Sequence, residues 1–255
     1  MIYVITHKKY CFPELDDEYK VLLVGAENKM ELKQYIRDDS GNNISEKNPF
    51  FCELTGLYWI WKNTSDDIVG ICHYRRYFTY RKEILKSNEL DKIFQKYDII
   101  LPKKIKFAGT VYQDYKYSEQ HNIQDMDMLI QLIDKRYPQY SESLHKVLNN
   151  KFFYPFNMMI MKRKYYDKYC EWLFDVLFQL EKIIPYKDYS GAKQRVFGYL
   201  SERLMLVWID YNIDRKKIKE LKVINLEGSE SISFKIKRRV NMFLTYHFNI
   251  DLRKK

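Results

Sequence analysis

The chain has 255 residues, of which 46% are hydrophobic and 31% are charged. That length and composition predict one large domain with a sizeable core, and they exclude a disordered or low-complexity chain. The 44 Lys and Arg outnumber the 34 Asp and Glu, and the formal net charge of +10 favours anionic partners such as nucleotides, nucleic acid or acidic lipid headgroups. Nucleic acid is the weakest of these, because the sequence contains neither a zinc-finger spacing nor an RNA-binding signature.

The four cysteines lie far apart and form no Cys-x-x-Cys pair, which argues against a zinc site and a disulfide framework and fits a reducing cytoplasm. The first residues turn polar too soon for a signal peptide, and no apolar run approaches the roughly 18 residues that span a bilayer. We therefore expect a cytoplasmic protein.

The first part of the chain predicts the opening of a nucleotide-binding α/β sheet. Apolar runs predict strands at 2–6 and 21–24, and turn-forming residues predict a polar loop at 37–47. A helix is expected from Asn48, which suits the N-cap, through Pro49 in the first turn to about residue 63.

The predicted strand at 68–72 ends abruptly in His73, Tyr74, Arg75 and Arg76. Side chains at the C-terminal end of a buried strand lie where open α/β sheets bind ligands, and a guanidinium matches phosphate oxygens two at a time. The segment therefore predicts a diphosphate site. An edge strand followed by a solvated basic turn would give the same sequence pattern and is the alternative.

Later in the chain, helices are predicted at 88–97, 125–137, 141–148, 165–184 and 194–213, and strands at 97–102, 156–161 and 221–225. Residues 109–124 predict a mobile polar loop, and the tail at 234–255 mixes basic and apolar side chains. Strands that alternate with helices predict an α/β fold with a largely parallel sheet. The sequence lacks a Gly-x-Gly-x-x-Gly or P-loop motif, which disfavours dinucleotide and P-loop chemistry.

Scattered polar residues at element ends remain as candidates. Glu202 lies in an apolar stretch of a predicted helix, where a carboxylate needs a partner or a role. Each of the others has an ordinary structural explanation: His7 suits a solvated turn, and Glu53 suits an ion pair with a lysine one helical turn away.

Four segments carry a family resemblance: NNISEKNPFFCELTGLYWIWKN at 42–63, VGICHYRRYF at 69–78, FNMMIM at 156–161 and GYLSERL at 198–204. Together they resemble a bacterial family known as domain of unknown function 4422, whose members are similar to sugar transferases of capsular and exopolysaccharide assembly. The resemblance implies a single-domain A-type glycosyltransferase, a Rossmann-like and mostly parallel sheet flanked by helices, over residues 1–225. A basic amphipathic C-terminal segment would follow at 226–255.

Transferases of that architecture commonly bind Mn²⁺ or Mg²⁺ through an Asp-x-Asp motif after a central strand. Here the matching place holds His73, Tyr74, Arg75 and Arg76, with no acidic pair. The sequence therefore assigns no metal ligand and leaves two alternatives open. Guanidinium groups would neutralise the leaving diphosphate in place of a cation, or His73 would ligate a metal.

The resemblance also implies roles for the remaining candidates. Glu202 would be the base that deprotonates the acceptor hydroxyl, with Asp125 and His121, beside Asp127, in reserve. The resemblance and the order of strands imply a diphosphate site (His73, Arg75, Arg76), a nucleotide site (Thr6, His7, Gly25, Asp39) and a sugar or acceptor site (Asn157, Glu53, Tyr74).

The function that we expect is transfer of a sugar, such as galactose in pyranose or furanose form, from a UDP-sugar to a lipid-linked saccharide. The protein would work in the cytoplasm, at the inner membrane face, where tail residues such as Lys235, Lys237, Arg238, Arg239, Phe243 and Leu244 contact anionic lipid. A basic helix that only closes the domain is an equal alternative for that tail. A non-catalytic saccharide-binding protein and a nucleic-acid-binding protein are the alternatives for the whole chain.

Overall fold

The computed structural model describes residues 1–29, 32, 34–228, 240–242, 244–246 and 248. Its centre is a sheet with the strand order β3-β2-β1-β4-β10-β7-β11-β5-β6. The strands are β1 (Ile2–Thr6), β2 (Tyr19–Leu23), β3 (Ile36–Arg37), β4 (Ile68–His73), β5 (Arg76–Tyr80), β6 (Glu83–Ile84), β7 (Ile99–Pro102), β10 (Met159–Lys162) and β11 (Ile218–Asn225). A separate two-stranded sheet joins β8 (Ile105–Lys106) to β9 (Phe152–Phe153).

The sheet is mixed, so the expectation of a largely parallel sheet is wrong. The strands β3, β2, β1 and β4 are parallel, but β10 runs antiparallel to both of its neighbours, and β5 and β6 also pair antiparallel. Parallel neighbours need a long crossover, whereas β4 and β5 are joined by Tyr74 and Arg75 alone. A connection that short forces the chain to turn back on itself.

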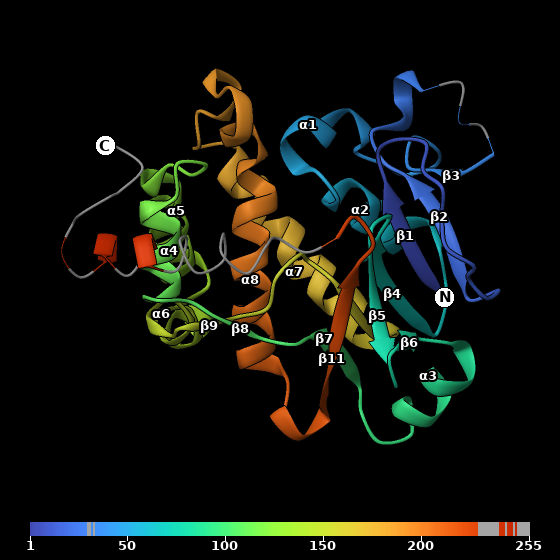
Figure 1. Ribbon diagram of the computed structural model, residues 1–255. Helices are drawn as coiled ribbons and strands as arrows, with labels where there is room; N and C mark the ends of the chain where they lie inside the picture. Colours follow the sequence, from blue (N-terminus) through green and yellow to red (C-terminus); the bar gives the residue numbers. More distant parts are fainter. Residues whose placement is uncertain (30–31, 33, 229–239, 243, 247, 249–255) are drawn as a thin grey trace.

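Helices cover the sheet unequally (Figure 1). They are α1 (Asn48–Phe51), α2 (Leu54–Asn63), α3 (Ser87–Phe94), α4 (Val111–Tyr117), α5 (Ile123–Arg136), α6 (Ser141–Asn149), α7 (Arg163–Glu181) and α8 (Val196–Asn212). The helix α7 packs between α2 and α8, and α4, α5 and α6 form a further group against α7 and α8. On the other face of the sheet, α3 and the aromatic loop after β1 cover a smaller apolar cluster.

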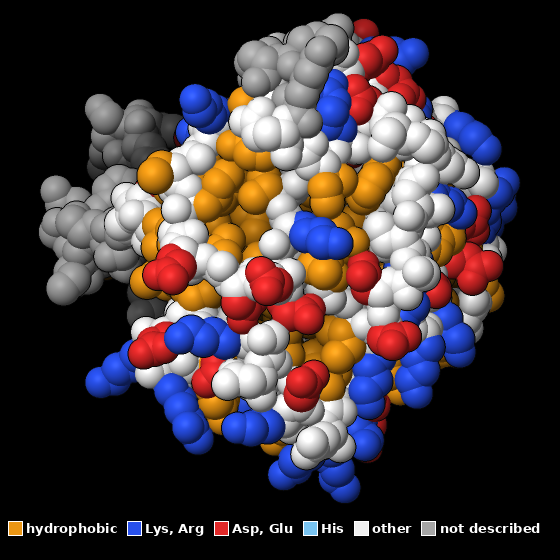
Figure 2. Space-filling view, turned by 90° about the vertical axis from the view of Figure 1, so that its right-hand side faces the viewer, with side chains coloured by type: hydrophobic (Ala, Val, Ile, Leu, Met, Phe, Trp, Pro, Cys, Tyr) orange, Lys and Arg blue, Asp and Glu red, His pale blue; other side chains and the backbone are white. Residues whose placement is uncertain are grey.

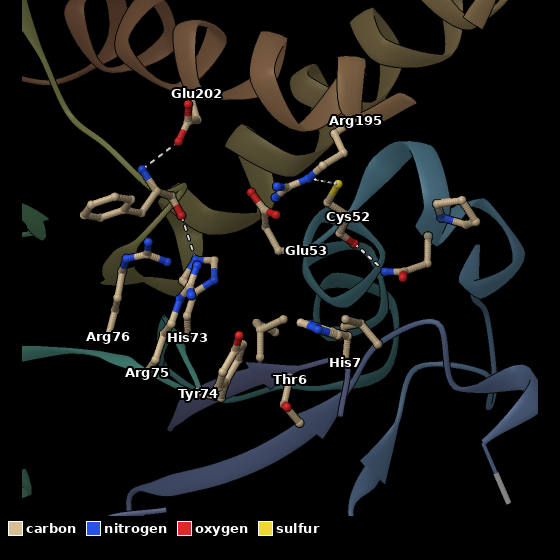
Figure 3. A pocket seen from close by; sticks show the side chains of 15 residues that line it. Thr6, His7, Cys52, Glu53, His73, Tyr74, Arg75, Arg76, Arg195 and Glu202 are labelled. Carbon is tan, nitrogen blue, oxygen red and sulfur yellow. Dashed lines mark hydrogen bonds between the residues drawn. The ribbon is translucent and has the colours of Figure 1, made fainter. Parts of the chain in front are cut away.

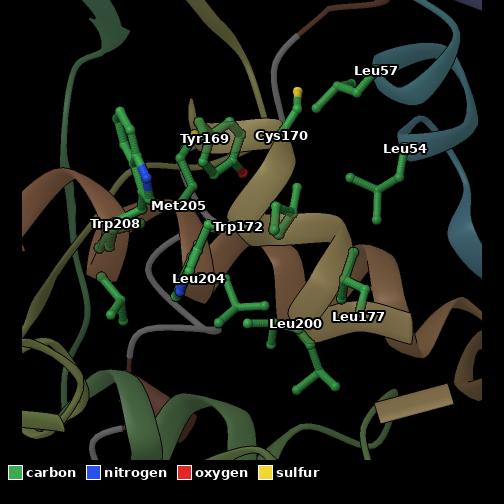
Figure 4. Close-up of a cluster of buried hydrophobic side chains, with 14 of the residues drawn as sticks. Leu54, Leu57, Tyr169, Cys170, Trp172, Leu177, Leu200, Leu204, Met205 and Trp208 are labelled. Atoms are coloured by element: carbon green, nitrogen blue, oxygen red, sulfur yellow. The ribbon is translucent and has the colours of Figure 1, made fainter. Parts of the chain in front are cut away.

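The main core lies where α7 and α8 cross behind the sheet (Figure 4). Trp208 and Met205 of α8 pack beside Tyr169 of α7, Cys170 of α7 points toward Leu57 of α2, and all five are at most 1% exposed. Burial of large apolar side chains is the main favourable term in folding, at roughly 25 cal/mol per Å². This packing therefore fixes α8, the helix that carries Glu202, against the sheet.

Two local differences from the predicted elements affect the site. The helix expected from Asn48 is broken at Cys52, whose φ of 53° ends α1 before α2 begins, and Asn48 is the first residue of α1, not its N-cap. The predicted mobile loop at 109–124 contains α4, which Thr110 begins with a capping box to Gln113.

The C-terminal prediction lies largely outside the described residues, as do Lys235, Lys237, Arg238, Arg239 and Phe243. The strand β11 ends at Asn225, and the domain boundary expected there stays a prediction. Tyr246 lies against Gly109, where an added Cβ would be 2.5 Å from its ring. In the described part of the chain, every helix is too short or too polar to form a transmembrane span.

Candidate active site

A cavity of about 500 Å³ opens at the C-terminal ends of β1 and β4, below the first turns of α8 (Figure 3). Its residues come from distant parts of the sequence. The strands β1 and β4 are parallel neighbours and end together, with Ile5 of β1 paired to His73 of β4. The lining residues are Ile5, Thr6, His7, Val24, Asn48, Pro49, Cys52, Glu53, His73, Tyr74, Arg75, Arg76, Phe156, Arg195 and Glu202.

The sheet wall of the cavity carries two neighbouring arginines. Arg76 lies over the ring of Phe156, with its guanidinium carbon 4.3 Å from the centroid, and Arg75 pairs with Glu227 at 2.6 Å. Burial and the charge of Arg75 lower the pKa of Arg76, but an arginine stays charged at any physiological pH. Both arginines thus line one cavity as permanent cations, although Arg75 is already paired with Glu227.

His73 completes this wall as a neutral group. Its Nε2 lies 2.7 Å from the carbonyl oxygen of Phe156, so this nitrogen carries the proton. Burial lowers the pKa of His73 against the opposing charge of Glu53, and the two arginines lower it further. His73 therefore holds the Phe156 peptide at the end of β4.

Glu202 faces this wall from α8, with 19% of its side chain exposed. Its Oε1 accepts a hydrogen bond from the backbone N–H of Phe156 at 2.7 Å, and its Oε2 accepts one from Nη1 of Arg203 at 3.1 Å. Burial raises the pKa of Glu202 to about 7, although Arg203 opposes the shift and Glu53 adds to it. A carboxyl that titrates near neutral pH suits proton transfer.

A second carboxylate, Glu53, is held by a strained asparagine. Asn157 has φ of 49° and is fully buried, and its Nδ2 donates to Oε1 of Glu53 at 2.6 Å and to Oγ of Ser201 at 2.8 Å. Asn157 itself does not line the cavity. It therefore orients Glu53 from behind.

Among the lining residues that the sequence reasoning did not assign to the site, Arg195 and Cys52 form a hydrogen-bonded pair. Arg195 extends into the cavity from the residue before α8, and its Nε donates to Sγ of Cys52 at 3.3 Å. Burial raises the pKa of the Cys52 thiol to about 11, so it remains protonated near pH 7. The sequence signal for this pair is its position relative to the motif segments. Cys52 lies within the segment 42–63, and Arg195 lies just before the segment 198–204.

The four residues predicted to bind the nucleotide divide into two groups. Thr6 and His7 line the cavity, and burial lowers the pKa of His7. Gly25 is outside the lining but lies directly against Asn48, which lines it. Asp39 pairs with Arg37 at 2.7 Å and is not part of the cavity wall.

The reserve candidates for proton transfer lie outside the cavity. His121 stacks on Tyr115 with 4.2 Å between ring centroids, and burial with the charge of Arg203 lowers the pKa of His121 to about 3. Asp125 is 1% exposed and accepts a hydrogen bond from Tyr189, while Asp127 accepts one from Tyr112. Tyr74 and Glu53 line the same cavity as Arg75 and Arg76. His121, Asp125 and Asp127 do not line it.

The comparisons with known proteins concern the fold and the family. The chain matches the apo structure of WbbM, a bifunctional glycosyltransferase, with a TM-score of 0.81 and 32% sequence identity. The match covers 89% of this chain but 45% of that protein, so the chain spans less than half of its length. None of the curated proteins matches the chain. The model of the family called domain of unknown function 4422 matches residues 1–213, and the chain therefore belongs to that family.

Proposed function

We propose that the protein is a glycosyltransferase of the A type that moves a hexose, such as galactose, from a UDP-sugar to a lipid-linked saccharide in surface polysaccharide assembly. One observation carries the proposal: Arg75 and Arg76 follow the central strand β4 and face Glu202 across a single cavity of about 500 Å³. The fold shared with a glycosyltransferase structure supports it.

The chemistry requires a base and a site for the leaving group, and the cavity offers both. The acceptor hydroxyl attacks the anomeric carbon of the donor, Glu202 removes the hydroxyl proton, and the bond to the UDP oxygen breaks. Arg75 and Arg76 stabilise the negative charge that develops on the departing diphosphate. Thr6 and His7 contact the nucleotide, while Glu53 and Tyr74 contact the sugar or the acceptor, with Asn157 behind Glu53.

The proposal includes a lipid-linked acceptor and an anionic membrane surface at which the protein meets it. A net charge of +10 favours a negatively charged surface. Nucleic acid is the competing explanation of this charge. On the face in Figure 2, acidic side chains gather near the centre and basic ones lie mostly around the lower and right-hand rim, unlike the basic stripe of a nucleic-acid-binding domain.

The test is a panel of nucleoside diphosphate sugars, with thermal stabilisation measured first and donor turnover second. We expect UDP-sugars to stabilise the protein, and Arg76→Ala to lose donor turnover by 100-fold or more while its melting temperature stays within a few degrees. Arg215→Ala is the matched control, because Arg215 is 72% exposed and lines a different cavity.

Three outcomes would count against the enzyme. Unchanged turnover in Arg76→Ala removes the arginine pair from the mechanism. Saccharide binding that persists in Glu202→Gln without donor turnover in the wild type favours a non-catalytic saccharide-binding protein. Oligonucleotide binding with a steep salt dependence, and no response to UDP-sugars, favours a nucleic-acid-binding protein.

A further inference from the structure

We propose that the donor diphosphate is held between guanidinium groups on two walls of the cavity, Arg75 and Arg76 on the sheet side and Arg195 on the helical side, and that this clamp takes the place of a divalent cation. The inference deepens the proposed function and rests on it. It adds Arg195 as a binding residue and states the metal requirement of the reaction.

Within the described part of the chain, Arg195 is held in place without a salt bridge, although the Glu53 carboxylate lies beside it. It ends the 3₁₀ turn Gly191–Arg195, its Nε donates to Sγ of Cys52, and its guanidinium carbon lies 5.6 Å from the centroid of the Tyr199 ring. A thiol is a weak acceptor, so this hydrogen bond fixes the direction of the side chain while its terminal nitrogens remain for a ligand. Figure 3 shows that the guanidinium points into the cavity beside Glu53, across from His73 and Arg76.

The charge of the cavity suits a diphosphate. Three guanidiniums line it, whereas burial lowers the pKa of both His7 and His73 and leaves these rings neutral at pH 7. Of the two lining carboxyls, Glu202 is partly protonated at pH 7, because burial raises its pKa to about 7. Glu227 lies outside the lining but pairs with Arg75, so the three guanidiniums are opposed by Glu227, Glu53 and the partly protonated Glu202. The excess is positive but small, and the diphosphate competes with Glu227 for Arg75.

The residues present do not fit the metal that the fold family implies. Where an acidic pair would stand, the chain has Tyr74 and Arg75, and Nε2 of His73 is already engaged by the carbonyl of Phe156. Among the residues described, no cluster of three or more His, Cys, Asp or Glu side chains could hold a metal ion. A divalent cation beside Arg75 and Arg76 would also be repelled by both.

The experiment compares the affinities of UDP and uridine, because only UDP carries the diphosphate. Binding is measured by calorimetry on the full chain, in excess EDTA and again with Mg²⁺ or Mn²⁺ added. We expect wild-type affinity for UDP to change less than twofold between these conditions. Arg195→Gln should weaken UDP binding about tenfold or more, the size expected for one charge-assisted hydrogen bond, and leave uridine binding unchanged.

Two further variants separate charge from folding. Lys193→Gln removes a positive charge from the same 3₁₀ turn, outside the cavity lining, and should not alter the affinity for UDP. Arg195→Lys keeps the charge and should recover part of the lost affinity.

The outcomes distinguish this inference from the proposed function. UDP binding that disappears in EDTA and returns with Mn²⁺ overturns the clamp and leaves the glycosyltransferase proposal standing. An unchanged ratio of UDP to uridine affinity in Arg195→Gln removes Arg195 from the clamp. Failure of the wild type to bind UDP under every condition overturns both.

Discussion

Replacing Glu202 with glutamine tests whether this carboxyl is the proton acceptor. Both of its oxygens already accept hydrogen bonds, from the N–H of Phe156 and from Arg203, and each oxygen retains a second lone pair for a substrate hydroxyl. Glutamine keeps the shape of the side chain but cannot take up a proton. We expect Glu202→Gln to lower the transfer rate by about 10²- to 10⁴-fold, the usual contribution of general base catalysis.

The pH dependence follows from the raised pKa. Transfer requires ionised Glu202, so the wild-type rate should rise about tenfold per pH unit below pH 7 and level off above it. Stability should change in the opposite direction. The folded pKa of about 7 exceeds the ordinary value of 4.5, so the folded protein binds the proton more tightly, and stability falls as pH rises from 4.5 to 7.

The stability difference has a defined size and window. Raising the pKa from 4.5 to about 7 corresponds to about 3 kcal/mol, present in full below pH 4.5 and lost above pH 7. Because glutamine stays neutral, the free energy of unfolding of Glu202→Gln should lack this component. Urea unfolding of both proteins between pH 4 and pH 8 measures the difference. A constant difference across that range, or a rate profile centred near pH 4.5, would refute the reasoning.

Three substitutions test how the surroundings of the cavity are held. Asp38 is fully buried and accepts hydrogen bonds from the N–H groups of Gly25 and Ala26 and from two hydroxyls; Asp38→Ala should lower the free energy of unfolding by about 3 kcal/mol or more in denaturant titrations, because it leaves buried donors unpaired. Gly25→Ala should cost about 1–3 kcal/mol by the same measurement, because φ is +57° and the new Cβ would lie 2.5 Å from the Asn48 side chain; an unchanged midpoint would contradict the turn geometry. Asn157→Ala should lower transfer at least tenfold by releasing Glu53, with Asn157→Gly as a control that tolerates φ of 49°; full activity in both variants would show that Glu53 needs no support.

The sequence was most informative where the signal was local. Polar residues directly after short apolar runs placed His7 and the segment from His73 to Arg76 at strand ends, and the structure brings these ends into one cavity. Glu202 stood out because a carboxylate in an apolar helix stretch is uncommon, and the same cavity contains it. The roles of these residues remain predictions.

The sequence was least informative where a residue depends on distant contacts. Arg195 falls in the first turn of the helix predicted at 194–213 and has no distinguishing signal in the sequence; it gains its position from Cys52, which lies 143 residues earlier in the chain. His121 was a reserve candidate for the base in a segment predicted to be a mobile loop, but it follows α4 in the structure, and its ring packs on Tyr115 and Tyr199 outside the cavity. The prediction of a largely parallel sheet was wrong for the same reason, since β10 comes from far along the chain and inserts between β4 and β7.

The backbone, more than any side-chain motif, sets the geometry of the site. Five non-glycine residues have positive φ in the described chain, and two of these, Arg81 and Lys82, form the tight hairpin turn between β5 and β6. The other three are Cys52, Phe156 and Asn157, beside the cavity.

Phe156, with φ of 82°, uses its N–H for Glu202 and its carbonyl for His73, so its backbone groups link α8 to the end of β4. Such conformations cost about 1–3 kcal/mol each and persist only where the surrounding contacts over-determine them. Here these contacts include the hydrogen bonds of Phe156 itself and those of Asn157 to Ser201 and Glu53. The acid and the imidazole are thus positioned through a strained backbone segment from a third part of the chain, and a spacing rule between side chains could not have revealed them as a unit.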